Sequence, residues 1–151
     1  MRIALGNDHA GFLLKDHARK TLEKLGHTVT DVGAPSSEPV DFPDITQNVT
    51  RLVLSGEADR GVLVCGTGVG ASIAANKIPG IRAMTAHDTY SARQGVEHDD
   101  VNVICMGAWL VGPVVVEQVL EEFLKAEFST DSDCRRRVEK IHQLEKLAAQ
   151  A

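Results

Sequence analysis

The chain has 151 residues, of which 43% are hydrophobic, and a formal net charge of −5. We expect a single domain over residues 1–151 with a substantial buried core. The only dense basic cluster, Arg135–Arg137, is too small to neutralise a nucleic-acid backbone, so we expect no nucleic-acid partner. No segment approaches the length of a membrane span, and Asn7 and Asp8 interrupt the first apolar residues before a signal peptide can form. We therefore expect a cytoplasmic protein that does not bind membranes.

Three cysteines, Cys65, Cys105 and Cys134, are spread along the chain without a C-x-x-C pair or a spacing typical of zinc ligands. Their odd number and their spacing argue against a disulfide framework and against a metal site. We expect three reduced thiols. Cys105 belongs to an apolar strand and is expected in the core, whereas Cys134 is expected to be exposed.

From the N-terminus onward, short runs typical of strands alternate with patterns typical of helices. The expected strands are residues 2–6, 27–33, 61–66, 80–86 and 102–107. The expected helices are residues 10–25, 44–54, 71–77, 89–97, 111–128 and 133–148. Because the central strands are almost entirely apolar, this alternation predicts an α/β fold with a parallel sheet that helices cover on both faces.

Local signals set several of the helix ends. Gly26 is a C-terminal stop for the first helix, and Pro79 ends the third. Asp44 with Gln47 three residues later is typical of a capping box at the start of the second helix. The last helix carries apolar residues along one face, which suits it to pack on a partner subunit: Val138, Ile141, Leu144 and Ala148.

In a parallel sheet, ligands bind at the carboxyl ends of the strands, where loops from neighbouring units converge. Three strand ends carry chemically useful side chains. These are Asn7, Asp8 and His9 after the first strand, Cys65 and Thr67 after the third, and His87 and Asp88 after the fourth.

The stretch CGTGVGA opens the helix that follows the third strand and contains glycine at positions 66, 68 and 70. The simplest interpretation of this stretch is a tight strand-to-helix connection. Three alternate glycines with Thr67 between them nevertheless favour a cradle of backbone N–H groups for an anion or ligand. Gly66, Gly68 and Ala71 also fit the dinucleotide pattern G-x-G-x-x-A. That pattern fits poorly here, because Pro79 cuts the helix short and the strand-to-strand unit is too short.

Cys65 stands where the strand gives way to this turn. An isolated cysteine is more often a small buried apolar residue than a reactive one. At the start of a ring of N–H donors, however, a thiolate is stabilised and suits the role of a base. We therefore interpret Cys65 as a candidate base.

Other candidates have ordinary explanations that stand beside the functional ones. Asp8 and His9 are either capping residues or a hydrogen-bonding corner of a site. His98 is either a surface histidine or a site residue. The run Arg135–Arg137 is by default the solvated start of the last helix, although a guanidinium there has the forked donors that bind phosphate.

The segments GNDHAG, DFPD, CGTGVGASIAANK, YSAR, EHDDVNV and RRVEKI together resemble the ribose-5-phosphate isomerase B family, which includes the galactose-6-phosphate isomerase subunits. The resemblance extends from Arg2 to about Leu144. It implies a Rossmann-like three-layer sandwich with a five-stranded parallel sheet, assembled as a homodimer or tetramer with active sites at the subunit interface. It also implies that neither a metal nor an organic cofactor is used.

The resemblance further implies residue roles. Cys65 moves a proton between the first two sugar carbons, Thr67 supports ring opening and oxygen protonation, and Asp8 relays to the hydroxyls. His98 opens the furanose ring from the neighbouring subunit. Substrate contacts are implied for His9, Gly66, Gly68, Val69, Gly70, Asp99, Arg136 and Arg137, with His9 and Arg137 at the phosphate.

This chain departs from the family pattern mainly at the phosphate end. Trp109 and Asp133 stand where the family commonly has arginine, so two expected cations are missing. The remaining departures are Asp99 for asparagine, Phe42 for tyrosine, and Asn7 for cysteine or serine. We expect that either Arg136 replaces the missing cations as a phosphate ligand or the sugar has a different length, for which the indole of Trp109 would shorten the pocket.

These observations predict a metal-independent aldose–ketose isomerase of the ribose 5-phosphate/ribulose 5-phosphate type. The reaction passes through an enediolate, which needs one base beside a carbon acid and donors aimed at the developing oxyanion. Isomerisation of a tetrose phosphate such as erythrulose 4-phosphate is the alternative within the enzyme class. Outside it, a nucleotide- or anion-binding module would use the glycine turn without needing Cys65.

Overall fold

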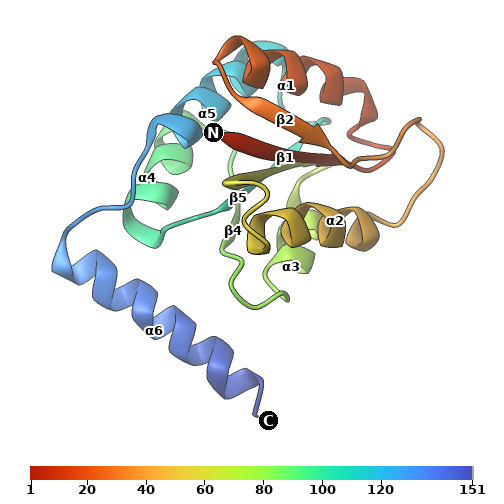
Figure 1. Cartoon of the computed structure of the whole chain (residues 1–151). Coiled ribbons are helices and arrows are strands. Elements are labelled where there is room, and N and C mark those ends of the chain that lie inside the picture. The colour runs from red at the N-terminus through yellow and green to blue at the C-terminus, as the bar shows by residue number, and fades with distance from the viewer. Residues whose placement is uncertain (151) are drawn as a thin grey trace.

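The computed structural model describes residues 1–150 and contains five strands in one parallel sheet (Figure 1). The strand order is β2-β1-β3-β5-β4. The strands are β1 (Arg2–Asn7), β2 (Thr28–Asp31), β3 (Arg60–Cys65), β4 (Ala83–Thr85) and β5 (Val103–Gly107). The helices are α1 (Phe12–Lys24), α2 (Phe42–Leu54), α3 (Val69–Ala75), α4 (Thr89–Asp99), α5 (Pro113–Lys125) and α6 (Ser132–Ala148). The predicted α/β class and the five-stranded parallel sheet are confirmed.

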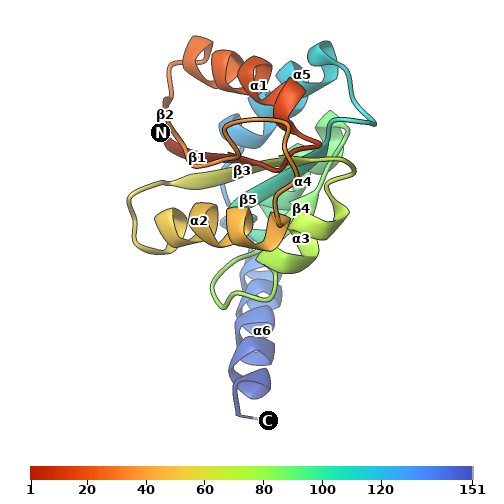
Figure 2. The same cartoon turned by 90° about the vertical axis from the view of Figure 1, so that its right-hand side faces the viewer.

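Helices cover both faces of the sheet, as the views in Figures 1 and 2 show. Buried residues of α1, α4 and α5 pack on one face, and those of α2 and α3 pack on the other. Along β3, Val62 and Val64 belong to the first core, whereas Leu63 and Cys65 belong to the second. Because successive side chains of a strand point to opposite faces, the Cys65 side chain is directed toward the α2/α3 layer.

Several sequence-based boundaries need correction. Residues Asp44 and Gln47 do not form a capping box, because α2 begins at Phe42 with a proline in its first turn and Asp41 at the N-cap. Proline at such a position has a φ already suited to a helix, so α2 starts earlier than the box predicts. Helix α3 starts at Val69, two residues ahead of the predicted start, and β4 and α5 are shorter than predicted.

Cys134 is buried, at 6% exposure, so its predicted exposure is wrong. The Asp131 side chain accepts hydrogen bonds from the amides of Asp133 and Cys134 and so caps α6. This places Cys134 one helical turn before the buried Val138, on the same face. Cys105 is fully buried, as predicted, and burial raises the pKa of its thiol.

Helix α6 projects from the rest of the molecule, and its last turn lies away from the sheet (Figures 1 and 2). The Glu145 carboxylate tethers it by accepting from the Gly80 amide at 3.2 Å. On either side of Glu145, Leu144 and Leu147 are 65% and 63% exposed. The far part of α6 therefore presents apolar side chains that the protomer itself does not cover. No helix among residues 1–150 has the length and apolar character needed to cross a membrane.

Helix α5 offers a test of how the first core is built. The Phe123 side chain is fully buried and also lies under the Arg60 guanidinium, 5.1 Å from the ring centroid. We expect Phe123→Ala to lower the free energy of unfolding by about 3–5 kcal/mol, through lost burial and a residual cavity. Urea unfolding at fixed protein concentration measures this change. The control Val114→Ala, at a residue of the same helix that is 67% exposed, should change the free energy of unfolding by less than about 0.5 kcal/mol.

Candidate active site

The turn after β3 is built around the thiol of Cys65. Its sulfur accepts a hydrogen bond from the Gly68 amide at 3.0 Å, and Gly68 has a φ of 83°, a conformation that favours glycine. The Thr67 hydroxyl oxygen accepts from the Val69 amide at 3.3 Å. Two of the turn amides that the sequence assigns to an anion cradle are thus engaged by side chains of the turn itself. Cys65 is 7% exposed, whereas Thr67 is exposed.

A second loop, residues 107–109 after β5, lies directly against this turn. Cys65 is the register partner of Gly107, and the chain continues with two hydrogen bonds back to the turn. The Ala108 amide donates to the Cys65 carbonyl at 2.7 Å, and the Trp109 amide donates to the Gly66 carbonyl at 3.1 Å. The two loops therefore hold one another by backbone bonds.

Aromatic rings flank the turn on two sides. A Cβ at Gly66 would lie 2.7 Å from the Trp109 ring, and a Cβ at Gly70 would lie 2.9 Å from the Phe42 ring. Trp109 is 73% exposed, so its indole lies over the turn at the surface. Both rings occupy positions where the sequence departs from the family pattern.

Asp8 lies on the adjacent strand end, at the same edge of the sheet. Its amide donates to the Val64 carbonyl at 3.2 Å, and its carboxylate accepts from the Gly11 amide at 2.9 Å. The side chain is well buried, at 7% exposure. Asp8 does not cap α1, whose N-cap is Gly11; its carboxylate instead closes the turn that precedes the helix, and its other oxygen is free of this bond. His9 follows on the surface, where its Nδ1 accepts from the Val40 amide at 3.3 Å.

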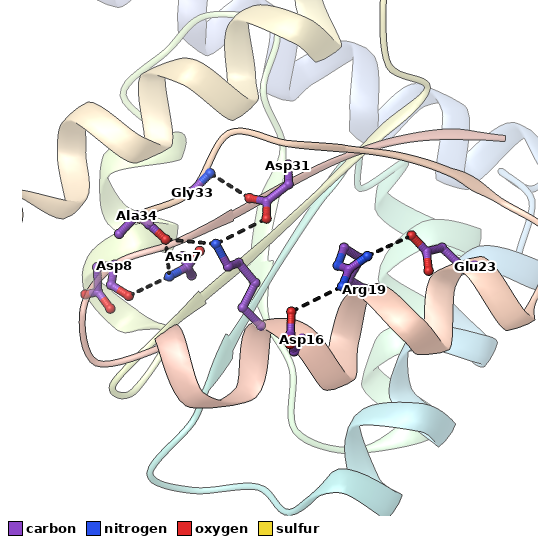
Figure 3. Close-up of polar contacts among 9 residues, drawn as sticks. Asn7, Asp8, Asp16, Arg19, Glu23, Asp31, Gly33 and Ala34 are labelled. Carbon is purple, nitrogen blue, oxygen red and sulfur yellow. Dashed lines mark hydrogen bonds and ion pairs between the residues drawn. The ribbon is translucent and has the colours of Figure 1, made fainter. Parts of the chain in front are cut away.

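Hydrogen bonds of Asn7 connect the backbone of Asp8 to the loop after β2 (Figure 3). The Asn7 amide nitrogen donates to the Asp8 carbonyl at 2.9 Å, and the Ala34 amide donates to the Asn7 carbonyl at 2.9 Å. No donor within residues 1–150 reaches the fully buried Asn7 Oδ1. A Cβ at Gly33 would lie 2.0 Å from this oxygen, so a Cα hydrogen of Gly33 points at it and forms a weak contact.

Lys15 is a supporting residue that the sequence analysis missed. Its Nζ donates to the Ala34 carbonyl at 2.8 Å and pairs with Asp31 at 3.1 Å, and only 11% of its side chain is exposed. The signal was present, because Lys15 stands three residues before Ala18 on the buried face of α1. The lysine ties the loop after β2 to the first turn of α1.

His98 and Asp99 lie at the opposite edge of the sheet. Helix α4 begins beside the carboxyl end of β4 and returns to the amino ends of the strands, where the Asn102 amide donates to the Arg82 carbonyl next to β4. Both side chains are exposed. One protomer therefore does not bring His98 or Asp99 to Cys65.

Arg136 and Arg137 lie on α6, also away from the turn. Arg136 pairs with Asp133 at 2.5 Å and Arg137 with the same carboxylate at 3.7 Å. The hydrogen bond from Arg136 holds the pKa of Asp133 below its usual range. Within one protomer, the candidate site thus contains Asp8, His9, Cys65 and the turn of residues 66–70. It contains neither His98 and Asp99 nor the α6 arginines.

Comparisons with known proteins agree with this architecture. The family model for ribose/galactose isomerases matches residues 3–141. Ribose-5-phosphate isomerase B of Escherichia coli is 41% identical over 95% of this chain and 96% of that protein. D-erythrulose-4-phosphate isomerase 2 of Mycolicibacterium smegmatis is 40% identical over 93% of this chain and 95% of that protein.

The solved structure of ribose-5-phosphate isomerase B from Clostridium thermocellum superposes with a TM-score of 0.94 at 43% identity, covering 98% of this chain and 99% of that one. Family model, sequence relatives and solved structure all match nearly the whole chain, so the resemblance seen in its motifs is confirmed. The chain belongs to the ribose/galactose isomerase family and is a sugar-phosphate isomerase.

Proposed function

We propose that the enzyme interconverts the aldose and ketose forms of a short sugar phosphate through an enediolate, with Cys65 as the base. The Cys65 thiolate takes the proton from C2 of the open-chain aldose, and the C1 carbonyl oxygen is protonated as the enediol forms. The thiol then returns its proton to C1, while the O2 proton leaves and the carbonyl forms at C2. The observation that carries this proposal is the position of the Cys65 sulfur, which accepts a hydrogen bond from the Gly68 amide at the carboxyl edge of the sheet.

The neighbouring groups suit the other steps. Thr67 presents an exposed hydroxyl two residues from the base, in position to exchange protons with the sugar oxygens. Asp8 offers a carboxylate oxygen from the next strand end for the sugar hydroxyls. His9 is exposed beside it and is our candidate, with Arg137 or Arg136 of a partner, for the phosphate. The neutral thiol of Cys105, on the same face of the sheet, adds no charge near the base.

The substrate proposal has two members that differ in length. Ribose 5-phosphate is supported by the names of relatives such as the Escherichia coli protein, and erythrulose 4-phosphate by the name of the Mycolicibacterium smegmatis protein. The Trp109 ring favours the shorter sugar, because it lies against Gly66 and occupies space at the turn. The ion pairs of Asp133 also favour the shorter sugar, because they engage Arg136 and Arg137, which are the candidate phosphate ligands.

We further propose that the active enzyme is a homodimer or a tetramer built from such dimers. His98 lies at the edge of the sheet opposite Cys65, so ring opening requires this histidine from another subunit. The exposed Leu144 and Leu147 on the projecting α6 supply an apolar face for that contact. A partner seated there would also carry Arg136 and Arg137, our candidate phosphate ligands, on the same helix.

Replacing the base tests the mechanism. We expect Cys65→Ala to lower kcat by about 10²- to 10⁴-fold, because it removes a general base while deleting little volume. Isothermal titration with substrate should show nearly unchanged affinity. Cys134→Ala, which removes a buried thiol on α6, is the matched control and should turn over normally. Near-native turnover by the Cys65 variant would show instead that the thiol is not the base.

Mixing two inactive proteins tests the shared site. Cys65→Ala and His98→Asn subunits, allowed to exchange, form mixed dimers in which one of the two sites keeps both residues. With random pairing of dimers, about a quarter of wild-type activity should return. Native mass spectrometry verifies the exchange. No recovery despite proven exchange would place both residues in the same subunit's site.

Restoring cations tests the substrate. We expect Trp109→Arg combined with Asp133→Arg to raise kcat/KM for ribose 5-phosphate relative to tetrose phosphates by tenfold or more, since each new charge-assisted hydrogen bond contributes about 1.5–3 kcal/mol. A panel of four-, five- and six-carbon sugar phosphates measures the ratio. Leu110→Arg, a cation at an exposed neighbouring position, is the control. An unchanged ratio in the double variant would mean that these positions do not select the substrate.

A further inference from the structure

Three positions line up across the carboxyl edge of the sheet: Cys65 ends β3, Gly107 ends β5, and His87 follows β4 by two residues. The ladder between β4 and β5 ends with Thr85 opposite Cys105, followed by a bond from the Ala86 amide to the Cys105 carbonyl at 3.2 Å. Beyond this point the backbone of the β4 segment no longer pairs with β5. The next donor of β5, the Gly107 amide, is bonded by a side chain instead.

His87 provides that bond. Its Nε2 accepts from the Gly107 amide at 2.8 Å. An imidazole nitrogen accepts only when it carries no proton, so this hydrogen bond assigns the neutral ring with its proton on Nδ1. The half-buried side chain thereby fixes the last residue of β5 from the side opposite Cys65.

Gly107 transmits this restraint to the turn that holds the thiol. A Cβ at Gly107 would lie 2.7 Å from the Thr67 backbone and 2.8 Å from the Gly66 carbonyl oxygen, so the end of β5 and the turn after β3 are in close contact. The next two amides donate to the carbonyls of Cys65 and Gly66. A shift of Gly107 therefore moves the donors that hold the carbonyl of Cys65 and the carbonyl of the next residue, Gly66.

We propose that His87 is a positioning residue for the isomerisation: it anchors Gly107, and through Gly107 it fixes Cys65 and the loop that carries Trp109. This proposal rests on the role of Cys65 as the base. Thr85, in the same segment, does not replace this anchor. Its hydroxyl donates to the Gly68 carbonyl at 3.3 Å and not to β5. Among residues 1–150, His87 provides the hydrogen bond to the donor at the end of β5.

Two amide substitutions separate positioning from a general structural role. In His87→Gln the side-chain carbonyl reaches about as far as Nε2, whereas in His87→Asn it reaches only as far as Nδ1 and cannot accept from Gly107. We expect His87→Asn to lower kcat by about 10- to 100-fold with KM within about twofold, because a small displacement of a catalytic group is costly. His87→Gln should recover most of the lost rate.

Alkylation of Cys65 by iodoacetamide, followed by peptide mapping, gives a readout that needs no substrate. We expect it to slow in His87→Asn and to recover in His87→Gln, measured well below the melting temperature of each protein. The proposal is overturned if His87→Asn keeps wild-type kcat and alkylation rate, if His87→Gln performs no better than His87→Asn, or if only KM changes, which would make His87 a substrate contact. Should wild-type protein turn over no sugar phosphate, the proposed function fails, and the alkylation comparison still decides the role of His87.

Discussion

The site depends on a close contact between the ends of two parallel strands. β3 and β5 pair so that Cys65 lies opposite Gly107, and the absence of a side chain at Gly107 lets the β5 loop rest on the backbone of Thr67. Hydrogen bonds from Ala108 and Trp109 then close the contact. The sulfur, the Thr67 hydroxyl and the indole of Trp109 all branch from this junction, so their relative positions depend on its backbone geometry.

The same topology separates the functional groups of one chain. In a parallel sheet covered by helices, strand ends collect at one edge and helix ends at the other. Asp8 and Cys65 lie at the first edge, whereas His98 lies in the last turn of α4 at the second. Arg136 and Arg137 lie near the start of α6, which leaves the body, and are paired with Asp133. An assembly that joins opposite edges of two copies brings these groups together, and the uncovered leucines of α6 favour such an assembly.

The sequence predicted the central strands well because they follow from local patterns, and the candidate site at their carboxyl ends was selected by the same kind of reasoning. Apolar runs bounded by glycine locate β3 and β5, and the carboxyl-end rule selects Asp8, Cys65 and His87. It failed where a competing signal prevailed. The proline after Phe42 moved the start of α2 ahead of the Asp44 box. Cys134 stands four residues before Val138, so it extends the buried stripe of α6 that the analysis began one turn too late.

The aromatic contacts could not be predicted, because they join residues far apart in the sequence, and they change what the glycine pattern means. Of the three alternate glycines, only Gly68 has a positive φ. Gly66 and Gly70 instead leave room for the rings of Trp109 and Phe42. Two of the three glycines thus serve ring packing, and two of the turn amides serve Cys65 and Thr67. The turn is therefore built first to hold the Cys65 thiol and the Thr67 hydroxyl, and these two turn amides are already engaged within the protein.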